Sequence, residues 1–254
     1  MNYEIIKKSI DQLKGKIGFY YKDLNSGTSF GVNENESFIA ASMIKIPVLI
    51  EAYRQFRQKI VSKEELIEIK KAERVPSCGA VAYIHEGARL TLKDLCILMI
   101  ILSDNMAANL LIKKLGINNI NAFMAQIGLE KTRINRILFD SDAEKSGKQN
   151  YFTPYEISAL FEMMWNGSLI SKEDSRKMLE IFKLQQVNYK IPYLLSEDVC
   201  IAHKTGDDAE ITHDAGIIYA PNPFILCFAS NGTDVNETDQ FIRQTTKEIF
   251  EEHC

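Results

Sequence analysis

Hydrophobic residues along the chain follow two spacings, one typical of helices and one typical of strands. Residues 3–14 and residues 238–252 carry apolar side chains at helical intervals, which predicts an amphipathic helix near each end of the chain. From about residue 42 to residue 190 the pattern is again mainly helical. Strands are predicted where short apolar or alternating runs lie between turn signals: residues 16–24, 28–34, 199–206, 215–221 and 224–230.

The order of these segments predicts an α+β fold. Strands from both ends of the chain would pair in one sheet, and the helical stretch between them would form an inserted lobe. We expect an α/β lobe made of residues 1–41 and 191–254, and a helical lobe made of residues 42–190. The chain has 254 residues and contains no repeat or low-complexity linker, so we expect both lobes to fold as one unit.

Composition and charge exclude two classes of partner. Apolar residues make up 46% of the chain and charged residues 25%, and the net charge is -4 without a long basic block, so no nucleic-acid partner is expected. The longest apolar stretches, residues 38–50 and 95–103, are too short to span a bilayer, so they are interpreted as buried helices and no membrane partner is expected.

The first 21 residues lack the pattern of a secretory signal, so the chain as written is expected in the cytoplasm, or outside it if a leader has been removed. Five widely spaced cysteines without a Cys-x-x-Cys pair predict free thiols in a reducing compartment. The four histidines show no ligand spacing, so we expect no metal and no other cofactor. Nothing in the sequence indicates an oligomer, and a monomer is expected.

The apolar stretch at residues 38–50 contains a lysine in its middle. If residues 42–53 form a helix, Ser42 and Lys45 lie one turn apart on the same face. A serine hydroxyl needs a nearby base to attack an amide, and burial lowers the pKa of a lysine enough for it to take that proton. The alternative is an ordinary helix lysine whose stem covers apolar surface while its ammonium group reaches water.

Three consecutive polar residues, Ser103, Asp104 and Asn105, interrupt the next apolar helical run. One interpretation is a helix kink or cap, because these residue types bond to the nearby backbone. In the other interpretation the Ser103 hydroxyl carries a proton, while the Asn105 amide binds both Lys45 and a substrate carbonyl.

A third motif, Lys204-Thr205-Gly206, ends a segment with strand character, and there Lys204 and Thr205 could bind a substrate carboxylate. Residues 145–147 also fit the pattern Lys-Ser/Thr-Gly. They lie in a polar run without a strand around it, so we reject them as part of a site.

Together, Ser-x-x-Lys, Ser-Asp-Asn and Lys-Thr-Gly in this order are the signature of class A β-lactamases and penicillin-binding proteins. The chain resembles this superfamily, and the class A β-lactamases most closely, over nearly its whole length. The resemblance implies a five-stranded antiparallel sheet flanked by helices, an inserted all-helical lobe, and a site between the two.

The resemblance also implies roles for the residues of the first two motifs. Ser42 would be the nucleophile, and Lys45 its base or proton carrier. Ser103 would pass a proton to the leaving nitrogen, and Asn105 would position the substrate.

At the third motif the resemblance implies a binding edge for the substrate. Lys204 would be a further catalytic residue. Together with Thr205, it would hold the substrate carboxylate beside Gly206. The oxyanion hole would use the backbone N–H groups of Ser42 and Asp207. Residues 207–217 contain no lysine or arginine, whereas some family members supply an arginine from this strand, so carboxylate binding is expected to be altered.

One departure from the family pattern bears on the function. Hydrolytic class A enzymes carry a glutamate two residues after the arginine that Arg136 matches, and this glutamate activates the water that clears the acyl-enzyme. Here that position holds Leu138, which cannot accept a proton. Asp140, Asp142 or Glu144 could substitute for the glutamate, or they could form a solvated acidic loop.

Three hypotheses follow for the function. The first is a serine hydrolase that opens β-lactam amides through an acyl-enzyme on Ser42, with slow deacylation. The second is an amidase or peptidase of the penicillin-binding type that acts on a different amide. The third is a β-lactam-binding protein that acylates without turnover. The expected partner is a small β-lactam or a peptide-like amide.

Overall fold

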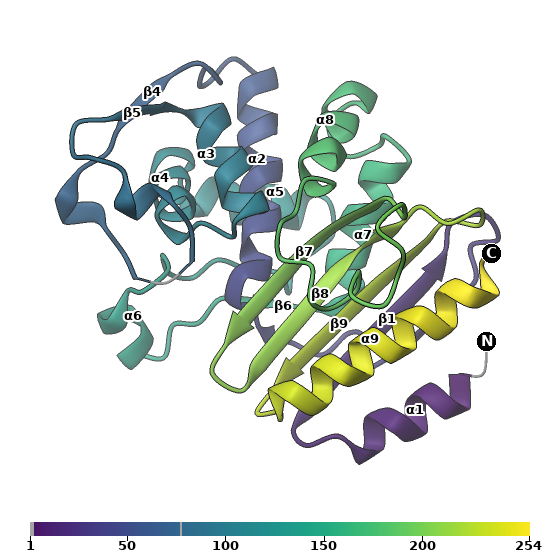
Figure 1. Cartoon of the computed structure of the whole chain (residues 1–254). Coiled ribbons are helices and arrows are strands. Elements are labelled where there is room, and N and C mark those ends of the chain that lie inside the picture. The colour runs from purple at the N-terminus through teal and green to yellow at the C-terminus, as the bar shows by residue number, and fades with distance from the viewer. Residues whose placement is uncertain (1–2, 77) are drawn as a thin grey trace. The chain divides into compact units, whose positions relative to one another are not determined.

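The computed structural model describes residues 3–76 and 78–254 (Figure 1). The chain divides into two compact units. One unit contains the chain up to Met43 together with Phe152–Cys254, and the other is Ile44–Tyr151.

The first unit is built on a five-stranded sheet with strand order β2-β1-β9-β8-β7, so β2 and β7 are its edge strands. Every neighbouring pair is antiparallel, as predicted, and the α+β fold with a five-stranded antiparallel sheet is confirmed. The strands are β1 Lys16–Asp23, β2 Ser29–Val32, β7 Ile201–Asp208, β8 Ile211–Ile218 and β9 Phe224–Asn231.

Helices cover both faces of this sheet (Figure 1). Because side chains alternate along a strand, Phe19 and Tyr21 of β1 join one apolar cluster with α1 (Tyr3–Gln12) and α9 (Val235–Glu252). Tyr20 points to the other face, where its ring packs edge-on against Tyr155 at a centroid distance of 5.7 Å.

Two helices that we expected in the helical lobe are grouped with the sheet. They are α7 (Pro154–Trp165), which begins with Thr153 as its N-cap and a proline in its first turn, and α8 (Lys172–Phe182). Helix α7 contacts β1, β8 and β9, and α8 contacts β7. The structural boundary therefore falls after Tyr151 rather than near residue 190, because the apolar faces of these helices are buried against the strands. The division into lobes otherwise stays a prediction.

The second unit consists of helices around α2. Helix α2 is buried along most of its length, including its polar residues Glu51 and Gln55, and contacts α3, α4 and α5. The expected all-helical lobe also contains a short antiparallel pair, β4 with β5, whose three-residue strands are too short to show a period in the sequence. The elements are α2 Lys45–Arg57, β4 Leu66–Glu68, η2 Lys71–Glu73, η3 Val81–Tyr83, β5 Arg89–Thr91, α3 Leu92–Ile101, α4 Asn105–Leu115, α5 Ile117–Gln126 and α6 Ser141–Lys145.

Two sequence expectations can be compared with the described residues. No disulfide joins any of the cysteines there, in agreement with their odd number and wide spacing. Within the same residues, no helix is both long enough and apolar enough to cross a membrane.

Candidate active site

Ser42 lies in a short 3-10 turn, η1 (Ala41–Ile44), which leads directly into α2. The helix that we expected from residue 42 therefore starts at Lys45, and a tighter turn precedes it. Ala41 has a φ of 41°, in the left-handed region that non-glycine residues rarely adopt. Backbone strain of this kind, next to the serine of a Ser-x-x-Lys motif, is typical of functional sites.

The segment before Ser42 is fastened to the sheet. In β3 (Phe38–Ile39), the N–H of Ile39 donates to Asn231 Oδ1 over 3.0 Å, and the carbonyl of Ile39 accepts from His213 Nε2 over 2.9 Å. Beyond the serine, Met43 packs so closely on Gly206 that a Cβ there would come within 3.2 Å of Met43 Cγ. Within the first unit, the turn that carries Ser42 is thus held beside the Lys-Thr-Gly motif.

His213 is neutral at pH 7 in this arrangement. Its Nε2 donates to Ile39 and its Nδ1 accepts from the Ser230 N–H over 3.1 Å, which is the bonding pattern of an uncharged ring. Burial lowers the pKa of His213 to about 4, while the Ile39 carbonyl opposes the shift and Lys190 adds to it.

This pKa predicts that acid destabilises the protein through His213. Because the unfolded ring has the higher pKa, the unfolded chain binds the extra proton first, so stability is complete above about pH 6.5 and is lost as the pH falls toward 4. The loss should reach roughly 3 kcal/mol. Urea unfolding of the native protein and of His213→Asn at several pH values measures it. The stability difference between the two should shrink on acidification, and a constant difference would refute this prediction.

The buried location of Lys45 is explained by its hydrogen bonds. The side chain is fully buried, and its Nζ donates to the Ser103 carbonyl over 2.6 Å, to Ser103 Oγ over 3.0 Å and to Asn105 Oδ1 over 2.7 Å. Three oxygen acceptors offset the cost of removing the amine from water. The lysine therefore does not reach solvent, and it connects two of the three motifs inside the second unit.

The polar motif at residues 103–105 separates α3 from α4 instead of lying within one helix. Ser103 has a φ of 53°, and Asp104 is the N-cap of α4, accepting from the Ala107 N–H over 2.9 Å. The same carboxylate accepts from the N–H groups of Ala80 and Val81 over 2.6 and 2.8 Å. Asp104 thus fixes the interruption between α3 and α4. This interruption lets both the carbonyl and the hydroxyl of Ser103 face Lys45.

The Lys-Thr-Gly motif lies on the edge strand β7, near its end. Lys204 and Thr205 are buried, and Lys204 Nζ donates to the Thr205 carbonyl over 2.7 Å. By strand alternation Thr205 and Asp207 project from one face of β7, and Lys204 and Gly206 lie on the other. An edge strand can pair with an extended ligand, because one side of its backbone has no neighbouring strand.

The backbone of Leu138 is held by a single side chain. Asn109, buried in α4, accepts from the Leu138 N–H over 2.8 Å and donates to the Leu138 carbonyl over 2.9 Å. Both bonds lie inside the second unit. Asn109 therefore fixes the backbone at the position that lacks the expected glutamate.

The acidic residues after Leu138 have structural partners in their own loop. Asp140 is the N-cap of α6 and accepts from the Ala143 N–H over 3.0 Å. Glu144 accepts from Arg136 Nη2 over 3.1 Å and pairs with Gln149. Asp142 is exposed in the first turn of α6. The solvated acidic loop is the interpretation that these contacts favour.

Comparison with known proteins agrees with the fold and motifs. The sequence profile of the Beta-lactamase enzyme family matches residues 2–253, and the chain belongs to this family. Its fold and its family define a serine-type β-lactam hydrolase.

Three similar proteins illustrate the relationship. A β-lactamase of Rhodobacter capsulatus is 26% identical over 236 residues, which cover 91% of this chain and 80% of the relative. The crystal structure of a β-lactamase from Sphaerobacter thermophilus superposes with a TM-score of 0.90 at 25% identity, covering 100% of this chain and 98% of the other. A leucine-to-glutamate variant of PBP-A, solved as an acyl-enzyme complex with penicillin G, has a TM-score of 0.89 at 26% identity, with 98% and 95% coverage.

Proposed function

We propose that this protein is a class A-like enzyme that opens β-lactam amides by acylation of Ser42 and then releases the acyl group slowly. The observation that carries the proposal is the combination of a complete acylation motif set with Leu138 in place of a general base. The chain therefore has the residues that acylation needs, but it lacks the base that deacylation needs at residue 138.

Acylation would follow the contacts around Lys45. Lys45 acts in its uncharged form, in which the amine donates to only two of its three oxygen neighbours, and its lone pair takes the proton of Ser42 Oγ as this oxygen bonds to the lactam carbonyl carbon. When the C–N bond breaks, the proton passes through Ser103 Oγ to the leaving nitrogen, and the 3.0 Å contact between Lys45 Nζ and Ser103 Oγ supports this path. The backbone N–H groups of Ser42 and Asp207 would bind the oxyanion, and Asn105 would position the substrate amide.

The substrate carboxylate would bind at the edge strand. Lys204 and Thr205 follow one another on that strand, with Lys204 Nζ bonded to the Thr205 carbonyl, and the close packing of Met43 on Gly206 supports a location next to Ser42. Lys204 would attract the carboxylate electrostatically, and the Thr205 hydroxyl would donate a hydrogen bond to it.

Slow deacylation is supported by the loop around Leu138. A leucine cannot activate water, and general-base catalysis typically supplies about 10²- to 10⁴-fold. Asp140 and Glu144 are engaged in capping α6 and in binding Arg136, which speaks against either of them as the replacement base. Likeness to PBP-A, a variant of which was trapped as a penicillin G acyl-enzyme, also supports acylation as the preserved step.

Intact-protein mass spectrometry after mixing with penicillin G tests the proposal. We expect one adduct of the full penicillin mass per chain, formed in a burst and lost slowly, because the β-lactam ring opens without a leaving group. Fast turnover without an accumulating adduct would refute slow deacylation. The absence of both adduct and turnover would refute the whole proposal.

A second candidate function is favoured by the same leucine. An amidase or peptidase of the penicillin-binding type would need the same acylation residues but would be adapted to a different amide. Faster turnover of D-alanyl peptides than of penicillin G would favour this alternative.

A further inference from the structure

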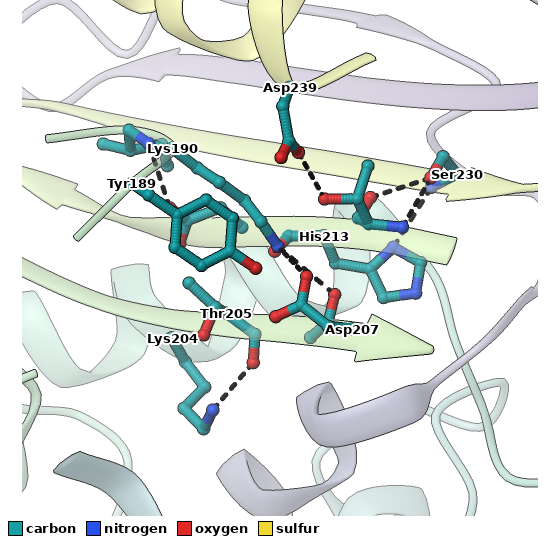
Figure 2. A network of polar contacts seen from close by, with 12 residues as sticks. Tyr189, Lys190, Lys204, Thr205, Asp207, His213, Ser230 and Asp239 are labelled. Carbon is teal, nitrogen blue, oxygen red and sulfur yellow. Dashed lines mark hydrogen bonds and ion pairs between the residues drawn. The ribbon is translucent and has the colours of Figure 1, made fainter. Parts of the chain in front are cut away.

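Lys190, a fully buried lysine, directs its amine to Asp207, the residue that follows Lys-Thr-Gly (Figure 2). Lys190 Nζ is 2.5 Å from Asp207 Oδ1, 2.8 Å from the His213 carbonyl and 3.4 Å from the Gly206 carbonyl. These three oxygens match the three N–H groups of an ammonium ion. Lys190 thus supplies a positive charge to this strand end, although residues 207–217 contain no cation of their own.

Asp207 keeps part of its carboxylate in solvent despite this pairing. Its side chain is 39% exposed, and it also accepts a hydrogen bond from the Tyr189 hydroxyl. Burial, followed by the charge of Asp207, raises the pKa of Tyr189, so the phenol stays protonated and remains a donor. One side of Asp207 is therefore fixed by Lys190 and Tyr189, and its other side faces outward.

A second carboxylate shares the positive charge of Lys190. Asp239, from α9, accepts from Thr212 Oγ1 over 2.6 Å; burial raises its pKa, and the Thr212 bond and Lys190 oppose this shift (Figure 2). Lys190 thus compensates two acidic groups. Seen from solvent, this end of β7 presents the negative charge of Asp207 and not the positive charge of Lys190.

We propose that the Asp207 side chain determines substrate specificity, selecting amides that carry a cationic group close to their carboxylate. The inference rests on the proposed function, which binds the substrate carboxylate at Thr205. Asp207 projects from the same face two residues further on, about 7 Å away. At that distance Asp207 repels additional negative charge and attracts a quaternary ammonium group, while Lys190 moderates the repulsion of the substrate carboxylate itself.

Two cephalosporins with the same thienylacetamido side chain test this charge selection. One carries a pyridiniomethyl group at C3, and the other carries an uncharged acetoxymethyl group. The quantity measured is the second-order acylation rate constant of the pyridinium compound divided by that of the acetoxymethyl compound. Both constants are obtained by stopped-flow absorbance at low salt. In Asp207→Asn we expect this ratio to fall roughly five- to tenfold, and added salt should lower the native ratio.

Asp208→Asn is the matched control. Asp208 is also exposed and adjacent in sequence, but its side chain leaves β7 on the face opposite Thr205 and Asp207 and one residue further from Thr205, so its removal should change the ratio less than about twofold. Equal effects of the two variants, or no effect of Asp207→Asn, would overturn the proposal and leave Asp207 as a structural partner of Lys190. Failure of both compounds to acylate the native protein would instead refute the proposed function.

Lys190→Met provides an opposite test. Removal of the buried cation leaves Asp207 and Asp239 uncompensated, so the acylation ratio should rise roughly fivefold in favour of the pyridinium compound. Adding Asp207→Asn to this variant should bring the ratio back down. A purely structural role of Lys190 would slow acylation by both compounds alike. If Lys190→Met does not fold, the comparison of Asp207→Asn with Asp208→Asn decides alone.

Discussion

Replacing Leu138 with glutamate is expected to speed deacylation about a hundredfold or more. The substitution would place a carboxylate where hydrolytic relatives carry their general base, and such a base is typically worth about 10²- to 10⁴-fold. Asn109 holds both backbone groups of residue 138, so the new side chain should leave from a fixed backbone position. The measurement is the first-order loss of the penicillin adduct, followed by intact-protein mass spectrometry after excess drug is removed.

Leu138→Gln is the matched control for this gain. Glutamine has nearly the shape of glutamate and the same demand for space and hydrogen bonds, but it cannot take a proton at neutral pH. Its adduct should decay close to the native rate. If glutamine speeds the decay as much as glutamate does, water access rather than base catalysis limits the native protein. If neither variant has an effect, the acyl group lies out of reach of residue 138.

The sequence was sufficient for the overall architecture because the relevant patterns are local. Strand patterns at both ends of the chain and helical periodicity between them predicted a sheet built from the terminal segments, and the family resemblance implied that it is five-stranded and antiparallel. The sequence pattern placed the end of the helical lobe near residue 190, whereas the compact unit ends at Tyr151 in the structure. Helices α7 and α8 show the same 3.6-residue period whether their apolar faces meet other helices or a sheet, so periodicity alone could not assign α7 to β1, β8 and β9 or α8 to β7.

The motif residues could be named from the sequence for a different reason. A lysine inside an apolar stretch must either reach water or find partners, and the structure shows Lys45 bonded to Ser103 and Asn105. Sequence could not show that Asp104 would cap α4 and separate it from α3, because capping and mid-helix polarity look alike in one dimension.

The pairing of Lys190 with Asp207 had no signal in the sequence. The two residues are 17 positions apart, and neither a helical nor a strand period relates them. Lys190 belongs to an irregular segment between α8 and β7, and a lysine in such a segment is ordinarily exposed. Its burial follows from the way this segment folds back along the β7–β8 hairpin, where the His213 and Gly206 carbonyls accept its hydrogen bonds.

Removing the amine of Lys45 is expected to slow acylation roughly a thousandfold, within the range that a general base supplies. Lys45→Met retains the length of the side chain but can neither accept the Ser42 proton nor pass it to Ser103. The rate constant for formation of the penicillin adduct measures the effect. Ser42→Ala should form no adduct at all, since it lacks the oxygen that would carry the acyl group.

Comparison of these two variants separates chemistry from folding. Ser42→Ala retains Lys45 and its bonds to Ser103 and Asn105, whereas Lys45→Met leaves polar groups buried without the amine and should lower the free energy of unfolding by about 1–3 kcal/mol. Acylation is therefore measured well below the melting temperature of each variant. An Lys45→Met protein that is folded and acylates within tenfold of the native rate would exclude Lys45 as the base. An adduct on Ser42→Ala would exclude Ser42 as the nucleophile.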